Sequence, residues 1–198
     1  MPIGAWPANP RAMLDVYADL YPYPSMPCSV LRAIKVGVRV DGQTLHLDYQ
    51  MMGKGDALAI PDAQAPARTD NLWQTTCCEV FLKAAGQTGY FEMNLSPSTQ
   101  WACYHFSSFR EGMADATIGA APVIKAEADA AGLRLQAEID LSMLPLDFAN
   151  SALTLALSCV VEGRDGAKSF WALNHPPEKP DFHHDDCFQL QIGAALRP

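Results

Sequence analysis

The chain has 198 residues, of which 49% are hydrophobic and 18% charged, and its formal net charge is -8 at pH 7. This length is enough for one domain with a sizeable core, and the composition is that of an ordinary globular protein. The negative balance disfavours nucleic acid and anionic membrane surfaces as partners, because both carry the same sign of charge.

The first predicted element is a short helix within residues 1–27. Asn9 is a suitable N-cap, and Pro10 suits the first helical position. The apolar residues that recur at helical spacing, and the prolines that end the pattern, are Met13, Leu14, Tyr17, Leu20, Tyr21, Pro22, Pro24 and Pro27. We expect this helix to pack on a single domain that spans residues 28–198.

From Cys28 onward the hydrophobic period changes to two, which is typical of β-strands. Residues 34–40 and 45–51 alternate on either side of Asp41-Gly42 and predict a hairpin. Further strands are predicted at residues 77–83, 90–96, 101–107, 122–128, 133–141, 153–161, 168–173 and 187–192. Residues 53–71 are predicted to form a long loop, and residues 142–145 a bend or single helical turn.

Many short strands and a single helix predict an all-β fold. We expect a two-sheet antiparallel β-sandwich that carries the short helix at its N-terminus. A parallel sheet would require crossover helices, and the sequence after residue 27 does not supply them.

The cysteines and the start of the chain bear on the cellular compartment. The six cysteines form no C-x-x-C pair, and most lie within apolar strand-like runs, where reduced cysteine acts as a small hydrophobe. The first residues lack the basic and apolar regions of a secretory signal, and no apolar run is long enough to cross a bilayer. These features favour a cytoplasmic protein with reduced cysteines.

Three polar residues lie within strands that otherwise appear buried by pattern: Glu79, Glu92 and Asn94. Carboxylate and amide groups on one sheet face can hydrogen bond to the hydroxyl groups of a ligand. Trp73, Trp101 or Trp171 could stack on the apolar face of a sugar ring. The competing interpretation places the acids on a solvated face and the tryptophans in the core. Glu79 and Glu92 could also be a carboxylate pair for glycoside hydrolysis, and their separation would decide the mechanism.

The segment from residue 171 to residue 188 is rich in imidazole, carboxylate and proline. A divalent metal such as zinc, iron or manganese could bind there, and the weak candidate ligands are His175, Asp181, His183, His184 and Asp186. The spacing matches no recognised zinc motif, so a proline-stiffened loop with internally satisfied histidines is favoured. We expect this loop to form one wall of a binding pocket whose floor comes from the strands at 77–83, 90–96 and 101–107.

Haem is a second possible cofactor. The residues able to serve as axial ligands are His105, His175, His183, His184, Met51, Met52, Met93 and Met113, and their spacing selects no pair.

Three segments in order resemble the DOMON-like superfamily, which includes the family 9 carbohydrate-binding modules. They are residues 70–82 (Trp73 to Glu79 to Phe81), residues 90–101 and residues 138–144, and the ending from residue 171 to residue 190 is similar to a bacterial DOMON-like subgroup. The resemblance covers residues 28–193 and implies a β-sandwich that binds a ligand without transforming it. Relatives bind sugars, and others hold b-type haem. Secreted relatives often have an aspartate where this chain has Thr75 and Thr76.

The sequence therefore predicts a non-catalytic, ligand-binding β-sandwich, with a saccharide as the best candidate ligand. The alternatives are a haem-binding domain and a metal-dependent enzyme centred on residues 175–186. The predicted ligand-binding residues are Trp73, Glu79, Glu92, Asn94, Trp101, Trp171, His175, His183 and His184. The oligomeric state stays open.

Overall fold

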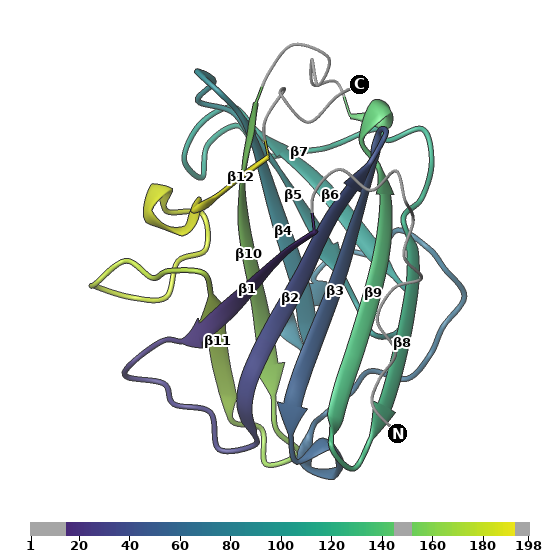
Figure 1. Ribbon diagram of the computed structural model, residues 1–198, viewed down its shortest axis with the longest axis vertical. Coiled ribbons are helices and arrows are strands. Elements are labelled where there is room, and N and C mark those ends of the chain that lie inside the picture. The colour runs from purple at the N-terminus through teal and green to yellow at the C-terminus, as the bar shows by residue number, and fades with distance from the viewer. Residues whose placement is uncertain (1–14, 145–151, 193–198) are drawn as a thin grey trace.

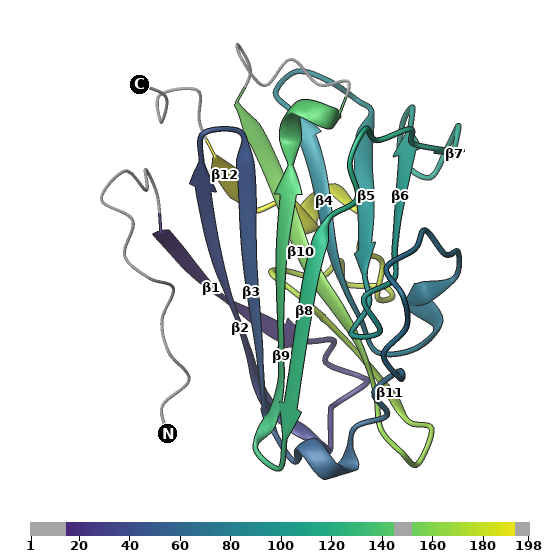
Figure 2. The same ribbon diagram turned by 90° about the vertical axis from the view of Figure 1, so that its right-hand side faces the viewer.

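The computed structural model describes residues 15–144 and 152–192. Their strands pair antiparallel throughout and form two layers (Figure 1 and Figure 2). The first layer has the order β1 (Asp15–Pro22), β2 (Leu31–Asp41), β3 (Thr44–Gly53), β9 (Gly132–Asp140) and β8 (Val123–Asp129). The second has the order β7 (Ala114–Asp115), β6 (Trp101–Phe106), β5 (Tyr90–Leu95), β4 (Cys77–Ala84), β10 (Leu153–Glu162) and β11 (Lys168–Ala172). β12 (Leu190–Ile192) also pairs with β10.

The prediction of an all-β antiparallel fold is therefore confirmed for the described residues. The Asp41-Gly42 hairpin joins β2 to β3, and Gly42 has a φ of 60°, a left-handed conformation that costs glycine little. Short 3₁₀ turns lie at Gly55–Ala57, Leu72–Gln74, Leu141–Met143 and Asp185–Cys187. The last of these replaces the first part of the strand that was predicted at residues 187–192.

The predicted N-terminal helix is wrong for the residues that the structure describes. Asp15–Pro22 is a strand in which Val16, Ala18 and Leu20 face inward while Tyr17 and Tyr21 are exposed. The sequence carries both a period of two and a helical spacing here, and pairing with two neighbouring strands selects the first. Asn9, Pro10, Met13 and Leu14 lie outside the described residues.

Strand β1 joins the two layers along one edge. Its residues 15–20 pair with β2, and Tyr21 and Pro22 pair with β11 of the other layer. Strands β8 and β7 are the two ends of the strand order and do not pair with each other. The result is a curled sandwich in which the apolar residues of both layers meet in one large core. No helix of the described residues is long and apolar enough to span a membrane.

The central strands of the second layer, β10, β4, β5 and β6, are buried on both of their faces. Cys78, Val80 and Leu82 of β4 face the main core. The alternate residues Cys77 and Phe81 belong to a second apolar cluster on the outer face. That cluster is covered by the segment between β11 and β12, which is drawn in yellow in Figure 1 and which we call the closing loop, residues 173–189. Polar side chains on this face are thus enclosed instead of solvated.

One hydrogen bond crosses the core between the layers. The fully buried Tyr49 of β3 donates its hydroxyl to the backbone oxygen of Glu79 in β4, at 2.7 Å. Burial raises the pKa of Tyr49 well above its usual range, so the hydroxyl stays protonated.

Replacing Tyr49 by Phe should remove this bond while keeping the ring. We expect a loss of about 1–2 kcal/mol in the free energy of unfolding, because the carbonyl oxygen of Glu79 loses its cross-layer donor. Urea unfolding followed by circular dichroism measures this loss. Tyr17→Phe, which changes an exposed hydroxyl of β1, is the matched control and should have little effect. Equal stabilities of Tyr49→Phe and the original protein would contradict this role.

Candidate functional site

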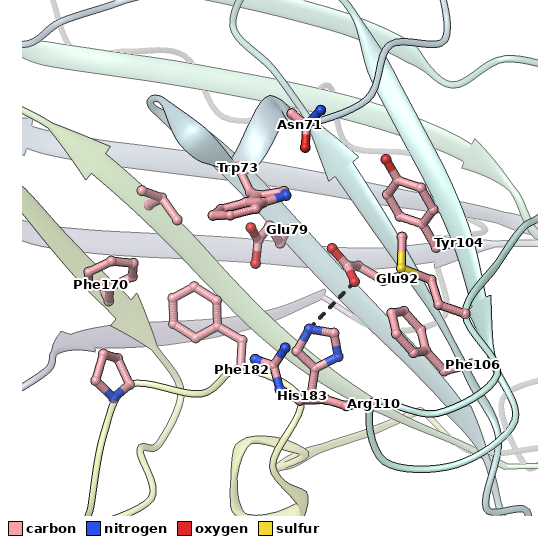
Figure 3. A pocket seen from close by; sticks show the side chains of 13 residues that line it. Asn71, Trp73, Glu79, Glu92, Tyr104, Phe106, Arg110, Phe170, Phe182 and His183 are labelled. Atoms are coloured by element: carbon pink, nitrogen blue, oxygen red, sulfur yellow. Dashed lines mark ion pairs between the residues drawn. The ribbon is translucent and has the colours of Figure 1, made fainter.

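A pocket of about 540 Å³ opens on the outer face of the second layer. Its floor includes Glu79 of β4, Glu92 of β5 and Phe106 of β6. The closing loop contributes Phe182 and His183 to one wall, as Figure 3 shows. The rest of the lining comes from Asn71, Trp73, Tyr104, Arg110, Met113, Val160, Phe170 and Pro180. The enclosed volume is in the range of pockets that hold small molecules.

The strand register explains how two acids come to share this floor. Glu79 lies opposite Asn94, and Phe81 lies opposite Glu92, in the antiparallel pair β4–β5. Residues that alternate along each strand fall on the same face, so Glu79, Glu92 and Asn94 all project from the outer face. Because the closing loop covers this face, the three side chains are 3%, 6% and 1% exposed.

Glu79 is the more deeply buried of the two acids. Ser158 of β10 donates its hydroxyl to Oε2 of Glu79 at 3.1 Å. Burial, followed by the charge of Glu92, raises the pKa of Glu79 to about 8, although Ser158 and Arg110 act in the opposite direction. The Glu79 carboxyl group is therefore largely protonated at neutral pH while the pocket is empty.

The Glu92 carboxyl group has two polar neighbours, the side chains of Asn94 and His183. Asn94 donates its Nδ2 amide to Oε1 of Glu92 at 2.7 Å, and His183 Nε2 lies 3.7 Å from Oε2. Burial raises the pKa of Glu92, against the lowering effects of Asn94 and Arg110. Asn94 is thus a positioning residue beneath the pocket and does not line it.

His183 takes part in a directed chain of polar contacts. The backbone amide of Arg110 donates to the Tyr90 hydroxyl at 3.2 Å, and this hydroxyl lies 2.8 Å from Nδ1 of His183. In the tautomer with the proton on Nε2, the Tyr90 hydroxyl donates to Nδ1 and the N–H of the ring lies on the side of Glu92. Burial and the charge of Arg110 lower the pKa of His183 to about 4, so its ring is neutral at physiological pH.

Arg110 fastens the closing loop to the loop that follows β6. Its guanidinium binds Asp181 through Nε and Nη2, with distances of 2.8–3.1 Å to the carboxylate oxygens. Burial raises the pKa of Asp181, but the bonds from Arg110 and the His183 backbone amide outweigh this effect and lower it overall. Arg110 also has a φ of 55°, and Asn71 across the pocket has a φ of 63°. Left-handed backbone at residues other than glycine often accompanies functional sites.

The structure brings together four of the predicted ligand-binding residues at the pocket, namely Trp73, Glu79, Glu92 and His183, with Asn94 directly beneath. Trp101 and Trp171 instead belong to the main core, where they are 9% and 3% exposed. Both face inward because they occupy core-facing registers of β6 and β11, opposite Leu95 and Cys159. Neither can stack on a ligand in this pocket.

The other two histidines among the predicted ligand-binding residues, His175 and His184, do not line the pocket. His175 Nε2 contacts the backbone oxygen of Tyr21 at 2.8 Å, and its ring packs edge-on against Tyr23. His184 caps the 3₁₀ turn at Asp185–Cys187, and its Nδ1 lies 3.4 Å from the Asp186 carboxylate. Both side chains support the shape of the closing loop.

The metal-site hypothesis finds no support among the described residues, where no group of three or more His, Cys, Asp or Glu is placed to hold a metal ion. Asp181 is engaged by Arg110, and His183 faces Tyr90 and Glu92 instead of the other candidates. His175, His183 and His184 each contact a neighbouring group of the protein, although Nδ1 of His175 has no hydrogen-bond partner among the described residues.

The haem hypothesis has little support from the geometry. Met51 and Met93 are buried in the main core, and His105 packs against Phe91. His183 and Met113 do line the pocket, but both ring nitrogens of His183 face partners. An axial bond would require the ring to give up one of them.

Sequence reasoning missed several lining residues, including Asn71, Tyr104, Arg110, Phe170 and Phe182. Arg110 and Asp181 are 71 positions apart in the sequence, and no local sequence pattern predicts that they pair. Phe170 and Phe182 were not predicted, because an apolar side chain is equally typical of a core. The left-handed backbone of Asn71 and Arg110 is visible only in the folded chain.

Comparison with known proteins gives a likeness of fold. No protein-family model matches the chain, and no curated protein is similar to it in sequence. A crystal structure of a proposed carbohydrate-binding protein from Bacteroides uniformis is similar with a TM-score of 0.60 and 15% identity, over 90% of this chain and 86% of that one. The chain therefore shares its β-sandwich fold with that protein.

Two structures of family 9 carbohydrate-binding modules from Caldicellulosiruptor kristjanssonii are more distant. The one in complex with glucose has a TM-score of 0.47 at 12% identity, over 90% of this chain and 84% of that one. The one in complex with cellotriose has a TM-score of 0.42 at 11% identity, over 78% and 75%.

The buried ionisable groups predict a dependence of stability on pH. Glu79 has a pKa of about 8 when folded and 4.5 as a free side chain, so the folded state holds its proton longer and stability falls as pH rises between these values. His183, with a pKa lowered from 6.5 to about 4, acts in the opposite direction, and only below pH 6.5. Between pH 6.5 and 8, Glu79 therefore changes the free energy of unfolding with pH, whereas His183 does not.

We expect the free energy of unfolding to fall by about 2 kcal/mol from pH 6.5 to pH 8, and this fall to be much smaller in Glu79→Gln. Urea unfolding at a series of pH values measures both. Glu178→Gln, at an exposed position of the closing loop, is the control and should keep the original profile. A profile of Glu79→Gln that is parallel to that of the original protein would rule out Glu79 as the source.

Proposed function

We propose that the protein binds a saccharide in the pocket of the second layer without transforming it. The observation that carries this proposal is the position of Trp73, whose side chain is 49% exposed at the pocket while buried carboxyl groups lie beneath it (Figure 3). An aromatic face beside convergent polar groups suits a sugar ring, which has an apolar face and a rim of hydroxyl groups.

The polar groups have the chemistry that hydroxyl groups require. Glu79 and Glu92 offer carboxyl oxygens, and the asparagine side chain of Asn71 at the rim offers both a donor and an acceptor. The aromatic rings of Tyr104, Phe106, Phe170 and Phe182 line the same volume and make its walls largely apolar. Hydrogen bonds made in such a setting are stronger than the same bonds in water.

We also propose that the chain is a DOMON-like protein related to the family 9 carbohydrate-binding modules. The segments that carry this resemblance in the sequence contain Trp73, Glu79, Glu92 and Asn94, which lie at or beneath the pocket. The fold likeness to the Bacteroides uniformis protein, described by its own name as carbohydrate-binding, agrees with this assignment.

Replacing Trp73 by Ala should weaken saccharide binding at least tenfold, about 1.4 kcal/mol or more, because the exposed indole supplies the stacking surface. Isothermal titration calorimetry against a panel of mono- and oligosaccharides identifies a ligand and measures the change. Tyr17→Ala, which removes an exposed aromatic ring from the other layer, is the matched control and should bind as the original protein does.

Recovery of the bound sugar unchanged, by chromatography after long incubation, is expected for a binding protein. The absence of binding to every sugar in the panel would contradict the proposal, and so would undiminished binding by Trp73→Ala. Release of cleaved products would instead favour glycoside hydrolysis by Glu79 and Glu92.

A further inference from the structure

The two acids of the pocket lack a cationic partner within the described part of the protein. Glu79 and Glu92 both project into it, and no lysine or arginine of residues 15–144 and 152–192 forms an ion pair with either. Arg110, the cation of the lining, has its guanidinium engaged by Asp181. His183, which faces Glu92, is neutral because of its burial. The pocket therefore offers two acids with no cationic partner of their own.

One carboxyl oxygen remains without a hydrogen-bond donor. Ser158 binds Oε2 of Glu79, whereas Oε1 of Glu79 accepts no hydrogen bond from any described residue, although the side chain is only 3% exposed. This oxygen is not sealed in the interior but is open to the pocket, where the donor of a ligand can reach it. Glu79 lines the pocket, and Figure 3 shows its carboxyl group beneath the indole of Trp73.

The walls suit a positive charge as well. Five aromatic side chains surround the volume: Trp73, Tyr104, Phe106, Phe170 and Phe182. The faces of aromatic rings are electron-rich, and an ammonium group near them is stabilised, most strongly where water is excluded. A neutral sugar would stack its apolar face on one ring and donate its hydroxyl groups to the carboxyl oxygens. An ammonium group would gain from the rings and the acids together.

We infer that the pocket selects a saccharide bearing a protonated amino group, that is, an amino sugar, whose ammonium group is received by the carboxylates of Glu79 and Glu92. This inference rests on the proposed function and names the class of saccharide. The sugar ring stacks on Trp73, and the ammonium group donates to Oε1 of Glu79 and to Glu92.

Binding of a cation should change the protonation of Glu79. The groups that face it are Glu92 from β5, Cys77 from its own strand, Ser158 from β10 and, more distantly, Arg110 from the loop after β6. Its high pKa arises from burial and from Glu92, and an ammonium group placed between the two acids would offset both. Near neutral pH, Glu79 therefore gives up a proton to the solvent when the ligand enters. A neutral sugar has no such effect.

The test compares three sugars of the same ring: D-glucosamine as its protonated salt, N-acetyl-D-glucosamine and D-glucose. Calorimetry at or slightly below neutral pH should give at least tenfold tighter binding of glucosamine than of either neutral sugar. Repeating the titration in buffers that differ in ionisation enthalpy should show about one proton released per glucosamine bound and none for glucose.

Glu79→Gln and Glu92→Gln keep the shape of each side chain and remove its charge. Each should lower the preference for glucosamine over N-acetylglucosamine at least tenfold, whereas Glu178→Gln should leave it unchanged. Thermal unfolding shows whether each variant is folded. Proton release is measured on the unaltered protein, so this part of the test stands even if a variant does not fold.

The outcomes separate the two proposals. Equal or tighter binding of the neutral sugars, or glucosamine binding without proton release, overturns the amino-sugar inference and leaves saccharide binding standing. Failure of every sugar in the wider panel to bind overturns saccharide binding and this inference with it. Tight binding of glucosamine with proton release, lost in Glu79→Gln, supports both.

Discussion

The burial of the central strands of the second layer on both faces is the constraint on which the site depends. A strand with one solvated face can carry acids there at little cost, whereas a strand enclosed on both sides cannot. Strand β4 packs Cys78, Val80 and Leu82 against the main core and turns Glu79 toward a second enclosed space. The closing loop creates that space, and the altered proton affinities of Glu79, Glu92 and His183 follow from it.

The polar groups of the pocket support one another across long sequence distances. Arg110 and Asp181 join the loop after β6 to the closing loop, and the backbone of Arg110 begins the chain that runs through Tyr90 to His183. Through His183 this chain faces Glu92, which Asn94 holds from below. The ion pair between the two loops thus also helps to hold His183 beside Glu92. The same ion pair keeps Phe182 at the wall.

The sequence predicted much of the scaffold and part of the site. Alternation placed β2, β3, β9 and β10 within a few residues of their observed bounds, because each has one face in the core and period two is a strong signal. Short runs rich in aromatic and β-branched residues did the same for β4–β6. At the N-terminus the helical spacing misled, although Val16, Ala18 and Leu20 alternate as in a strand. No pattern in the sequence separated Trp73, which is exposed, from Trp101 and Trp171, which are core, since all three precede or occupy strands.

The sequence by itself predicted antiparallel strands and placed Glu92 and Asn94 on one face of their strand, because side-chain direction in a strand follows from residue parity. The register of β4 against β5 then placed Glu79 on the same face of the sheet. Only the tertiary structure decided that this face is enclosed, that Arg110 is engaged by Asp181, and that one oxygen of Glu79 is left open toward an aromatic pocket. These properties arise from contacts between segments 70 or more residues apart, which no local pattern encodes.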